Sequence, residues 1–289
     1  MRTNVWGLLQ PYWLLTRMHR PIGILLLLWP TLMALWIAAE GIPDSKVLLI
    51  FIAGVVLMRA AGCAINDYAD RHIDGQVWRT ENRPLATGAL TARQALLTFA
   101  VLVLAALVLV LQLNLFTIAL SLVAVMLATL YPFMKRFTYL PQLVLGMAFG
   151  WAIPMAFTAQ LNALPSIVWW LLLANVIWTT MYDTFYAMAD REDDLKAGVK
   201  STAVLFGKYD LLIQALLQLA YLLVMAWIGL QLQLSLVFYL GLLAAALLFI
   251  YQLWLCRARE RQACLQAFLN NNWVGAIVFF SVAIHYSVS

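Results

Sequence analysis

Apolar segments long enough to cross a membrane recur along the whole chain, and this recurrence constrains the fold more than any other feature. A helix crosses about 30 Å of hydrocarbon in roughly 20 residues. Hydrophobic residues make up 65% of the chain and charged residues only 11%, well outside the usage of soluble proteins. We predict nine spans, at roughly residues 22–39, 47–65, 95–112, 115–132, 140–158, 166–186, 210–230, 235–255 and 270–287.

These spans predict an all-α polytopic membrane protein, because backbone groups in lipid must find their hydrogen bonds within a helix or a closed barrel. Leu and Ala dominate the spans without the alternation that a β-barrel requires. The nine helices account for the chain as one domain, residues 1–289. Long basic loops, 71–94 and 187–209, follow the second and sixth spans, which predicts two similar halves, about 21–135 and 140–262, and a final helix at about 270–287.

Basic residues set the expected orientation. Of the 18 Lys and Arg residues, only Lys46 falls outside the N-terminal segment, the even-numbered connections and their flanks. By the positive-inside rule, the N-terminus is cytoplasmic and the C-terminus lies on the outer side.

Residues 4–16 carry apolar residues at helical spacing, which predicts a helix at the membrane interface. The basic residues are spread over five loops, which indicates contact with anionic membrane lipid and gives no reason to expect nucleic-acid binding.

Two acidic clusters lie where apolar segments end, both on the predicted cytoplasmic side. The first extends from Asn66 to Asp74, and the second comprises Asp183 and the run from Asp190 to Asp194. Together they hold eight of the 13 acidic residues. Carboxylates at a membrane border cost free energy unless a cation holds them. The two clusters therefore indicate where the chemistry of this chain takes place.

Spacing within the first cluster predicts a shared helix face. If the second span continues as a helix through residue 74, Asn66, Asp70 and Asp74 lie at i, i+4 and i+8 on one face. Arg59 lies on the same face, seven residues before Asn66 and deeper in the membrane. Asp67 lies on the flank of this stripe.

The second cluster has a comparable stripe, because Asp183, Asp190 and Asp194 lie at i, i+7 and i+11. Two such helices facing each other create a pocket lined by carboxylates. Oxygen ligands of this kind suit Mg²⁺, which is commonly shared with substrate phosphates. Taken alone, either cluster is also explained by a solvated loop or by a salt-bridge network, but two clusters at equivalent places favour a binding site.

Basic residues beside the clusters point to a diphosphate ligand. Arg and Lys side chains neutralise phosphate oxygens, and together with a metal ion they stabilise a phosphate leaving group. The chain has no Walker-type glycine loop, so nucleotide hydrolysis is not indicated. In a membrane protein, the expected substrate is a polyprenyl diphosphate. The predicted phosphate-binding residues are Arg71, Arg79, Arg83, Lys135, Arg136, Lys196 and Lys200.

The motif residues resemble those of the UbiA superfamily of intramembrane aromatic prenyltransferases, closest to its bacterial members of ubiquinone biosynthesis. The resemblance covers nearly the whole chain. It rests on Asn66-Asp67-x-x-Asp70-x-x-x-Asp74 and Asp190-x-x-x-Asp194, and also on Arg59-Ala-Ala-Gly-Cys63, Asn82-Arg83-Pro84-Leu85, Tyr131-Pro-Phe-Met-Lys135-Arg136, Tyr182-Asp183 and Lys200-Ser201-Thr202-Ala203. It implies nine helices around a central cavity with a cytoplasmic-side active site, in a bacterial inner membrane with the C-terminus in the periplasm.

The resemblance also implies an activity. A polyprenyl group passes from polyprenyl diphosphate to the carbon ortho to the hydroxyl of 4-hydroxybenzoate, with Mg²⁺ as cofactor. The implied metal ligands are Asn66, Asp70, Asp74, Asp190 and Asp194, with Asp67 and Asp183 as catalytic supports. Candidates for the acceptor carboxylate are Arg20, Arg59, Lys135 and Arg136, of which Arg59 and Arg136 are favoured. Two alternatives stay open: a prenyltransferase for another aromatic acceptor, and a secondary transporter, whose ionisable residues should lie nearer the bilayer midplane.

Overall fold

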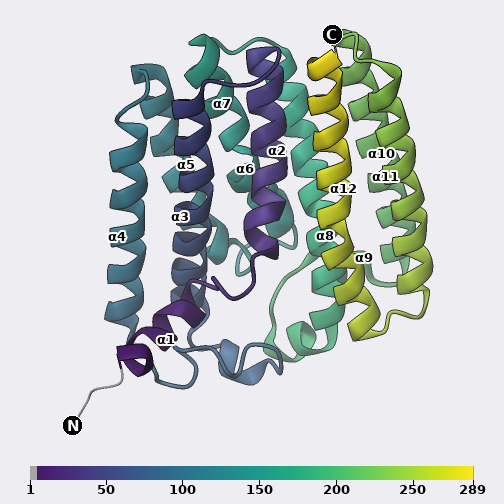
Figure 1. Cartoon of the computed structure of the whole chain (residues 1–289). Helices are drawn as coiled ribbons and strands as arrows, with labels where there is room; N and C mark the ends of the chain where they lie inside the picture. Colours follow the sequence, from purple (N-terminus) through teal and green to yellow (C-terminus); the bar gives the residue numbers. More distant parts are fainter. Residues whose placement is uncertain (1–4, 289) are drawn as a thin grey trace.

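The computed structural model describes residues 5–288, which form a bundle of helices with no strands within that range (Figure 1). The helices are α1 (Val5–Leu15), α2 (Ile22–Ala39), α3 (Ser45–Asp70), η1 (Asp74–Gln76), α4 (Ala92–Val110), α5 (Leu115–Met134), α6 (Pro141–Gly150), α7 (Ala152–Leu161), α8 (Ile167–Ala197), α9 (Thr202–Phe206), η2 (Gly207–Tyr209), α10 (Asp210–Gln231), α11 (Leu236–Leu255), η3 (Cys256–Ala258) and α12 (Arg261–Val288).

Each predicted span corresponds to a helix, except that 140–158 is the pair α6 and α7. These two helices meet at Trp151, because Pro154 has no N–H to donate to the Gly150 carbonyl. Eight segments within residues 5–288 are long and apolar enough to cross a membrane, α6 and α7 counting as one. The remaining span is α8, whose membrane part carries polar residues such as Asn175 and Asp183, so the count of nine stays a prediction.

Two predictions at the helix ends are wrong. α3 ends at Asp70 and does not continue through residue 74. Conversely, α8 continues as a helix to Ala197, so the first half of the predicted loop 187–209 is helical. α8 ends at Gly198, which has the left-handed conformation (φ 67°) that glycine adopts without strain. The second acidic cluster is therefore held on one rigid helix, whereas the first is divided between α3 and η1.

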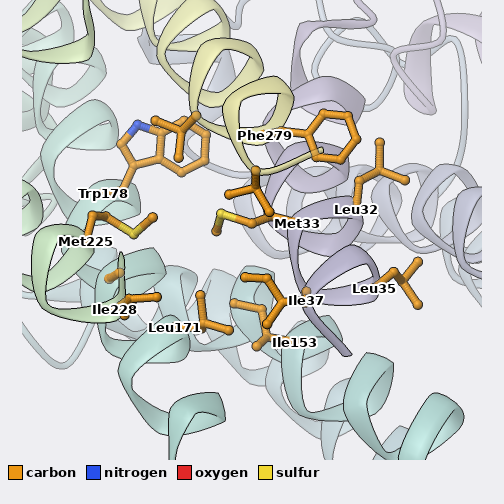
Figure 2. Close-up of a cluster of buried hydrophobic side chains, with 14 of the residues drawn as sticks. Leu32, Met33, Leu35, Ile37, Ile153, Leu171, Trp178, Met225, Ile228 and Phe279 are labelled. Atoms are coloured by element: carbon orange, nitrogen blue, oxygen red, sulfur yellow. The ribbon is translucent and has the colours of Figure 1, made fainter. Parts of the chain in front are cut away.

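The hydrophobic core lies among α2, α3, α7, α8, α10, α11 and α12, and Figure 2 shows part of it. Met33, Leu171 and Met225 are buried there. α4 and α5, by contrast, expose many large apolar side chains on their outer faces, as helices surrounded by lipid do. The segment that joins α3 to α4 lies at the same end of the bundle as α1, and the last turn of α12 lies at the opposite end.

The predicted N-terminal helix is confirmed as α1, although it continues through Pro11. Residue 4 of that prediction, Arg2 and Ser289 lie outside the described residues. No observation tests the division into similar halves, which stays a prediction. The outcome that matters for function is that the acidic clusters of α3 and α8 lie close together, as the contacts below show.

Candidate active site

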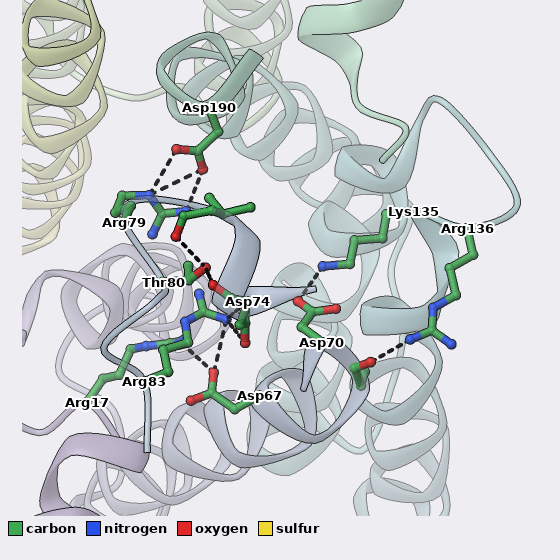
Figure 3. Close-up of polar contacts among 12 residues, drawn as sticks. Arg17, Asp67, Asp70, Asp74, Arg79, Thr80, Arg83, Lys135, Arg136 and Asp190 are labelled. Atoms are coloured by element: carbon green, nitrogen blue, oxygen red, sulfur yellow. Dashed lines mark hydrogen bonds and ion pairs between the residues drawn. The ribbon is translucent and has the colours of Figure 1, made fainter. Parts of the chain in front are cut away.

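The first acidic cluster is buried where α3 ends. Asp67 is 1% exposed and Asp70 is 3% exposed. The Asp67 carboxylate accepts a hydrogen bond from Arg17 Nη2 at 2.5 Å and forms a second ion pair with Arg83 at 3.2 Å. Asp70 pairs with Lys135 at the end of α5. Two negative charges are thus held inside the protein by basic residues from three other segments (Figure 3).

α3 ends at Asp70 because its last carbonyl groups find partners outside the helix. Arg136 Nη2 donates to the Ala69 carbonyl at 2.5 Å, and Arg71 Nη1 donates to the Tyr68 carbonyl at 2.7 Å. The backbone N–H of Ile73 donates to the Asp70 carbonyl at 2.7 Å. These bonds satisfy carbonyls that would otherwise need another helical turn. Two of the predicted phosphate-binding residues, Arg71 and Arg136, therefore also hold the end of this helix.

Asp74 nevertheless lies beside Asp67, because one guanidinium joins them. Arg83 Nη1 donates to both carboxylate oxygens of Asp74, each at 2.9 Å, while it also pairs with Asp67. The Thr80 hydroxyl donates to the Asp74 carbonyl at 2.8 Å and fixes the turn that carries the residue. The predicted grouping of Asp74 with the α3 carboxylates thus has a different cause from helical spacing.

Arg79 connects the segment after α3 to the second cluster. Its Nη2 donates to Asp190 Oδ2 at 2.5 Å, and its Nε lies 3.1 and 3.2 Å from the two carboxylate oxygens. The guanidinium also lies over the Tyr186 ring, 4.1 Å from its centroid. Asp183, Asp190 and Asp194 all lie on the continuous helix α8, as their spacing predicts. The two acidic clusters therefore face one another across Arg79 (Figure 3).

A cavity of about 1010 Å³ opens beside these ion pairs. Its walls come from α2 to α8 and α12, and they are largely apolar away from the acidic end. The predicted site residues that line it are Arg20, Arg59, Asn66, Asp67, Arg79, Arg83 and Asp183. The predicted site residues that do not line it, all of them in the described part of the chain, are Asp70, Arg71, Asp74, Lys135, Arg136, Asp190, Asp194, Lys196 and Lys200.

Burial changes the protonation of the carboxylates outside the spans. It raises the pKa of Asp194 to about 6, and the neighbouring Asp190 charge acts in the same direction. Burial also raises the pKa of Asp74, although the Arg83 guanidinium opposes it. Each carboxylate is therefore protonated more readily than an exposed Asp, and a bound cation would oppose this effect.

The donor set at the acidic end fits a hard divalent cation such as Mg²⁺. Asp67 Oδ2 and Asp70 Oδ1 are buried oxygens that have no hydrogen-bond partner among the described residues. Carboxylate oxygens are the ligands that Mg²⁺ prefers. Within residues 5–288, however, no three His, Cys, Asp or Glu side chains stand close enough together to hold a metal ion. Basic side chains occupy the positions between the carboxylates.

Sequence reasoning missed three residues that contact the site. Arg17 pairs with Asp67, and Tyr186 lies under the Arg79 guanidinium. Gln142, at the start of α6, has its side chain next to the Asp183 carboxylate. Tyr186 was detectable, since it precedes Asp190 by four residues on the same helix face. Arg17 and Gln142 come from distant segments, and no spacing rule predicts their contacts.

Comparisons with known proteins agree with this architecture. The model of the UbiA prenyltransferase family matches residues 27–282. The 4-hydroxybenzoate octaprenyltransferase of Aliivibrio fischeri (strain MJ11) is 57% identical over 274 residues, covering 95% of this chain and 96% of that one. The protein of the same name from Tolumonas auensis is 61% identical over 275 residues, covering 95% and 96%.

Solved structures share the fold at lower identity. A UbiA homolog from Aeropyrum pernix K1 superimposes with a TM-score of 0.79 at 24% identity, covering 91% of this chain and 97% of that chain. A UbiA homolog from Archaeoglobus fulgidus, bound to GPP and Mg²⁺, superimposes with a TM-score of 0.74 at 18% identity, covering 96% and 99%. The match of the family model and the high identity of the bacterial relatives lead to one conclusion: this chain belongs to the UbiA prenyltransferase family.

Proposed function

We propose that this integral membrane protein transfers a polyprenyl group from polyprenyl diphosphate to the carbon ortho to the hydroxyl of 4-hydroxybenzoate, a step of ubiquinone biosynthesis. The acceptor follows from the bacterial relatives, which are named for this reaction and are 57 and 61% identical to this chain. The observation that carries the chemistry is a cavity with carboxylates and guanidiniums at one end and largely apolar walls beyond. An allylic diphosphate has the same division into an anionic head and an apolar tail.

The acidic end would bind the diphosphate head. Mg²⁺, held by Asn66, Asp70, Asp74, Asp190 and Asp194, would supply positive charge that stabilises the leaving diphosphate. Arg79 and Arg83 line the cavity with their guanidiniums on carboxylates, so both can turn to phosphate oxygens. The other basic residues proposed for this head are Arg71, Lys135, Arg136, Lys196 and Lys200, whereas Arg20 stays a candidate for the acceptor carboxylate.

Arg59 is the residue that we propose for the acceptor carboxylate. It lines the cavity, and its Nε is buried without a hydrogen-bond partner. Among the described residues, its Nη1 donates only to the weak acceptor Sγ of Cys63. An unpaired guanidinium in an apolar wall costs free energy that a substrate carboxylate would recover. Arg136, the other favoured candidate, donates instead to the Ala69 carbonyl.

The remaining chemistry follows from exclusion of water. The allylic C–O bond breaks as negative charge develops on the diphosphate, and the allylic cation is attacked by the electron-rich ring carbon. The largely apolar walls keep out water, which would otherwise capture the cation. Asp67 and Asp183 line the cavity and support this site.

The orientation is also part of the proposal. The chain would cross a bacterial inner membrane nine times, with its N-terminus in the cytoplasm and its C-terminus in the periplasm. A reporter fused after residue 289 should give a periplasmic signal. A cytoplasmic signal would overturn the count of nine spans.

A membrane assay tests the activity directly. Membranes that contain the protein are incubated with labelled 4-hydroxybenzoate and a polyprenyl diphosphate, with and without EDTA. We expect a prenylated product that disappears with EDTA and returns when Mg²⁺ is added in excess. Product formation that EDTA leaves unchanged would contradict the metal site. If product forms from another aromatic acceptor, such as a naphthoate, but not from 4-hydroxybenzoate, the proposal that 4-hydroxybenzoate is the acceptor would be contradicted.

A further inference from the structure

The acceptor carbon must lose a proton, and no residue placed so far accepts it. The new C–C bond uses a π-electron pair of the ring, and the electrons of the broken allylic C–O bond leave with the diphosphate. The C–H bond at the attacked carbon must then break, and its electron pair restores the aromatic ring. A base must take this proton. The question arises only if the proposed function is correct, so this inference rests on it.

Among the residues that the structure describes, two acidic side chains line the cavity, Asp67 and Asp183. Asp67 is paired with Arg17 at 2.5 Å and with Arg83 at 3.2 Å. Asp183 forms no ion pair with any Lys, Arg or His in the described part of the chain. A carboxylate held by two guanidiniums is a poor proton acceptor, because the proton would displace favourable charge pairing. Of the two, Asp183 is therefore the one free to accept a proton.

The position of Asp183 suits the acceptor rather than the diphosphate. It precedes Asp190 by seven residues on α8, which is roughly 10.5 Å along the helix axis at 1.5 Å per residue. Arg59 precedes Asn66 by the same seven residues on α3. Both side chains line the cavity. The proposed carboxylate anchor and Asp183 thus lie about two helical turns deeper than the residues proposed for the metal and the diphosphate.

The surroundings of Asp183 hold its carboxylate without neutralising its charge. Gln142 is 4% exposed, and its side-chain amide lies next to the Asp183 carboxylate. The Gln142 side-chain oxygen accepts a hydrogen bond from the Thr202 backbone N–H at 3.3 Å. This bond engages the amide oxygen, so the amide nitrogen is the group of Gln142 that can donate to Asp183. The carboxylate is therefore oriented by a neutral donor.

We propose that Asp183 is the catalytic base that takes the proton from the prenylated ring carbon. The C–H bond breaks, its electrons return to the ring, and the proton binds a carboxylate oxygen of Asp183. After the diphosphate leaves, water entering from the acidic end removes the proton and restores the carboxylate. No oxidant or further reactant is needed.

A deuterium isotope effect tests the role of Asp183. The substrate is 4-hydroxybenzoate carrying deuterium at both carbons ortho to the hydroxyl. In the wild type we expect proton loss to be faster than breakage of the allylic C–O bond, so the deuterated and ordinary substrates should react at equal rates. In Asp183→Asn the turnover rate should fall roughly 10²-fold or more, and the deuterated substrate should react measurably more slowly. Asp183→Glu should recover part of the rate.

Asp67→Asn is the matched control, because Asp67 is the other carboxylate of the cavity. It should lower the rate without creating an isotope effect. An Asp183→Asn protein that reacts equally fast with both substrates would overturn the proposal and assign the proton to the diphosphate or to water. If Asp183→Asn gives no measurable product, Asp183→Ala is assayed with added formate. Restored product would support the base, and no restoration would overturn it.

These outcomes separate the inference from the proposed function. A wild type that makes no prenylated product from 4-hydroxybenzoate would contradict the function itself. An active wild type with an isotope-insensitive Asp183→Asn variant would contradict only the assignment of the base. Melting temperatures of the variants in detergent distinguish loss of the base from loss of the fold.

Discussion

Replacing Asp210 by Asn should destabilise the protein by about 3 kcal/mol. Asp210 is fully buried at the start of α10 and pairs with Arg191 of α8 and with Arg259 of the segment before α12. Arg259 Nη2 lies 2.8 Å from Asp210 Oδ1, and the Leu211 N–H donates to the same oxygen at 2.7 Å. The residue thus fixes the end of α8 that carries Asp190.

The expected loss of stability follows from how deeply Asp210 and its two Arg partners are buried. Removing one partner of a buried ion pair typically costs 3–5 kcal/mol, roughly, because the other charge stays buried. The Arg191 and Arg259 side chains are 21% and 38% exposed, so water takes over part of their solvation. We therefore expect the lower end of that range. At roughly 2 °C per kcal/mol, the melting temperature should fall by about 6 °C.

The assay is thermal unfolding of the detergent-solubilised protein, followed by tryptophan fluorescence. Glu192→Gln is the matched control, because Glu192 also joins α8 to α12, through Arg261 at 2.9 Å, but its side chain is 76% exposed. An exposed pair contributes about 0–1 kcal/mol, so this variant should melt within roughly 2 °C of the wild type. Equal shifts for Asp210→Asn and Glu192→Gln would refute the reasoning from burial.

Three further predictions concern activity. Asp190→Asn should abolish Mg²⁺-dependent prenyl transfer while membrane insertion, measured by protease protection, stays intact; full activity would contradict the metal site. Because the pKa of Asp194 is raised to about 6, protons should compete with Mg²⁺ as the pH falls through 6. The Mg²⁺ concentration for half-maximal activity should then rise between pH 7.5 and 5.5, and a constant value would exclude this competition. Gly23→Ala should raise the KM for 4-hydroxybenzoate, because the added Cβ would lie 2.3 Å from Arg59 Nε. The control Gly7→Ala, whose Cβ meets nothing within 4 Å and which does not line the cavity, should leave that KM unchanged.

The sequence predicts the helices of this protein well because lipid leaves the backbone few choices. α2 begins and ends at the predicted residues, 22 and 39, where the apolar segment does. The error at 187–197 has a physical cause. This stretch is strongly charged and resembles a solvated loop, yet Asp193 pairs with Arg261 at 3.0 Å and Arg191 pairs with Asp210. Contacts with distant helices keep it helical, and no local pattern records them.

For the candidate site, the sequence predicts which helix carries some of the acidic residues but not which side chains contact one another. Helical spacing correctly places Asp183, Asp190 and Asp194 along one helix. It fails for Asp74, because α3 ends four residues earlier, where Arg136 donates to the Ala69 carbonyl. Asp74 is held instead by its ion pair with Arg83. The sequence specifies which carboxylates and basic side chains the site can use. Which guanidinium meets which carboxylate depends on the three-dimensional packing of four separate segments.

These connections bear on how the ligands would bind. Arg79 pairs with Asp190, Arg83 with Asp74 and Lys135 with Asp70, so each proposed metal ligand among these carboxylates already has a basic partner. Mg²⁺ alone would displace guanidiniums and leave them buried and unpaired, and diphosphate alone would do the same to the carboxylates. When both bind, Mg²⁺ pairs with the carboxylates and the diphosphate pairs with the basic side chains, so every charged group keeps a partner of opposite charge. Metal and diphosphate are therefore expected to enter this site as a pair.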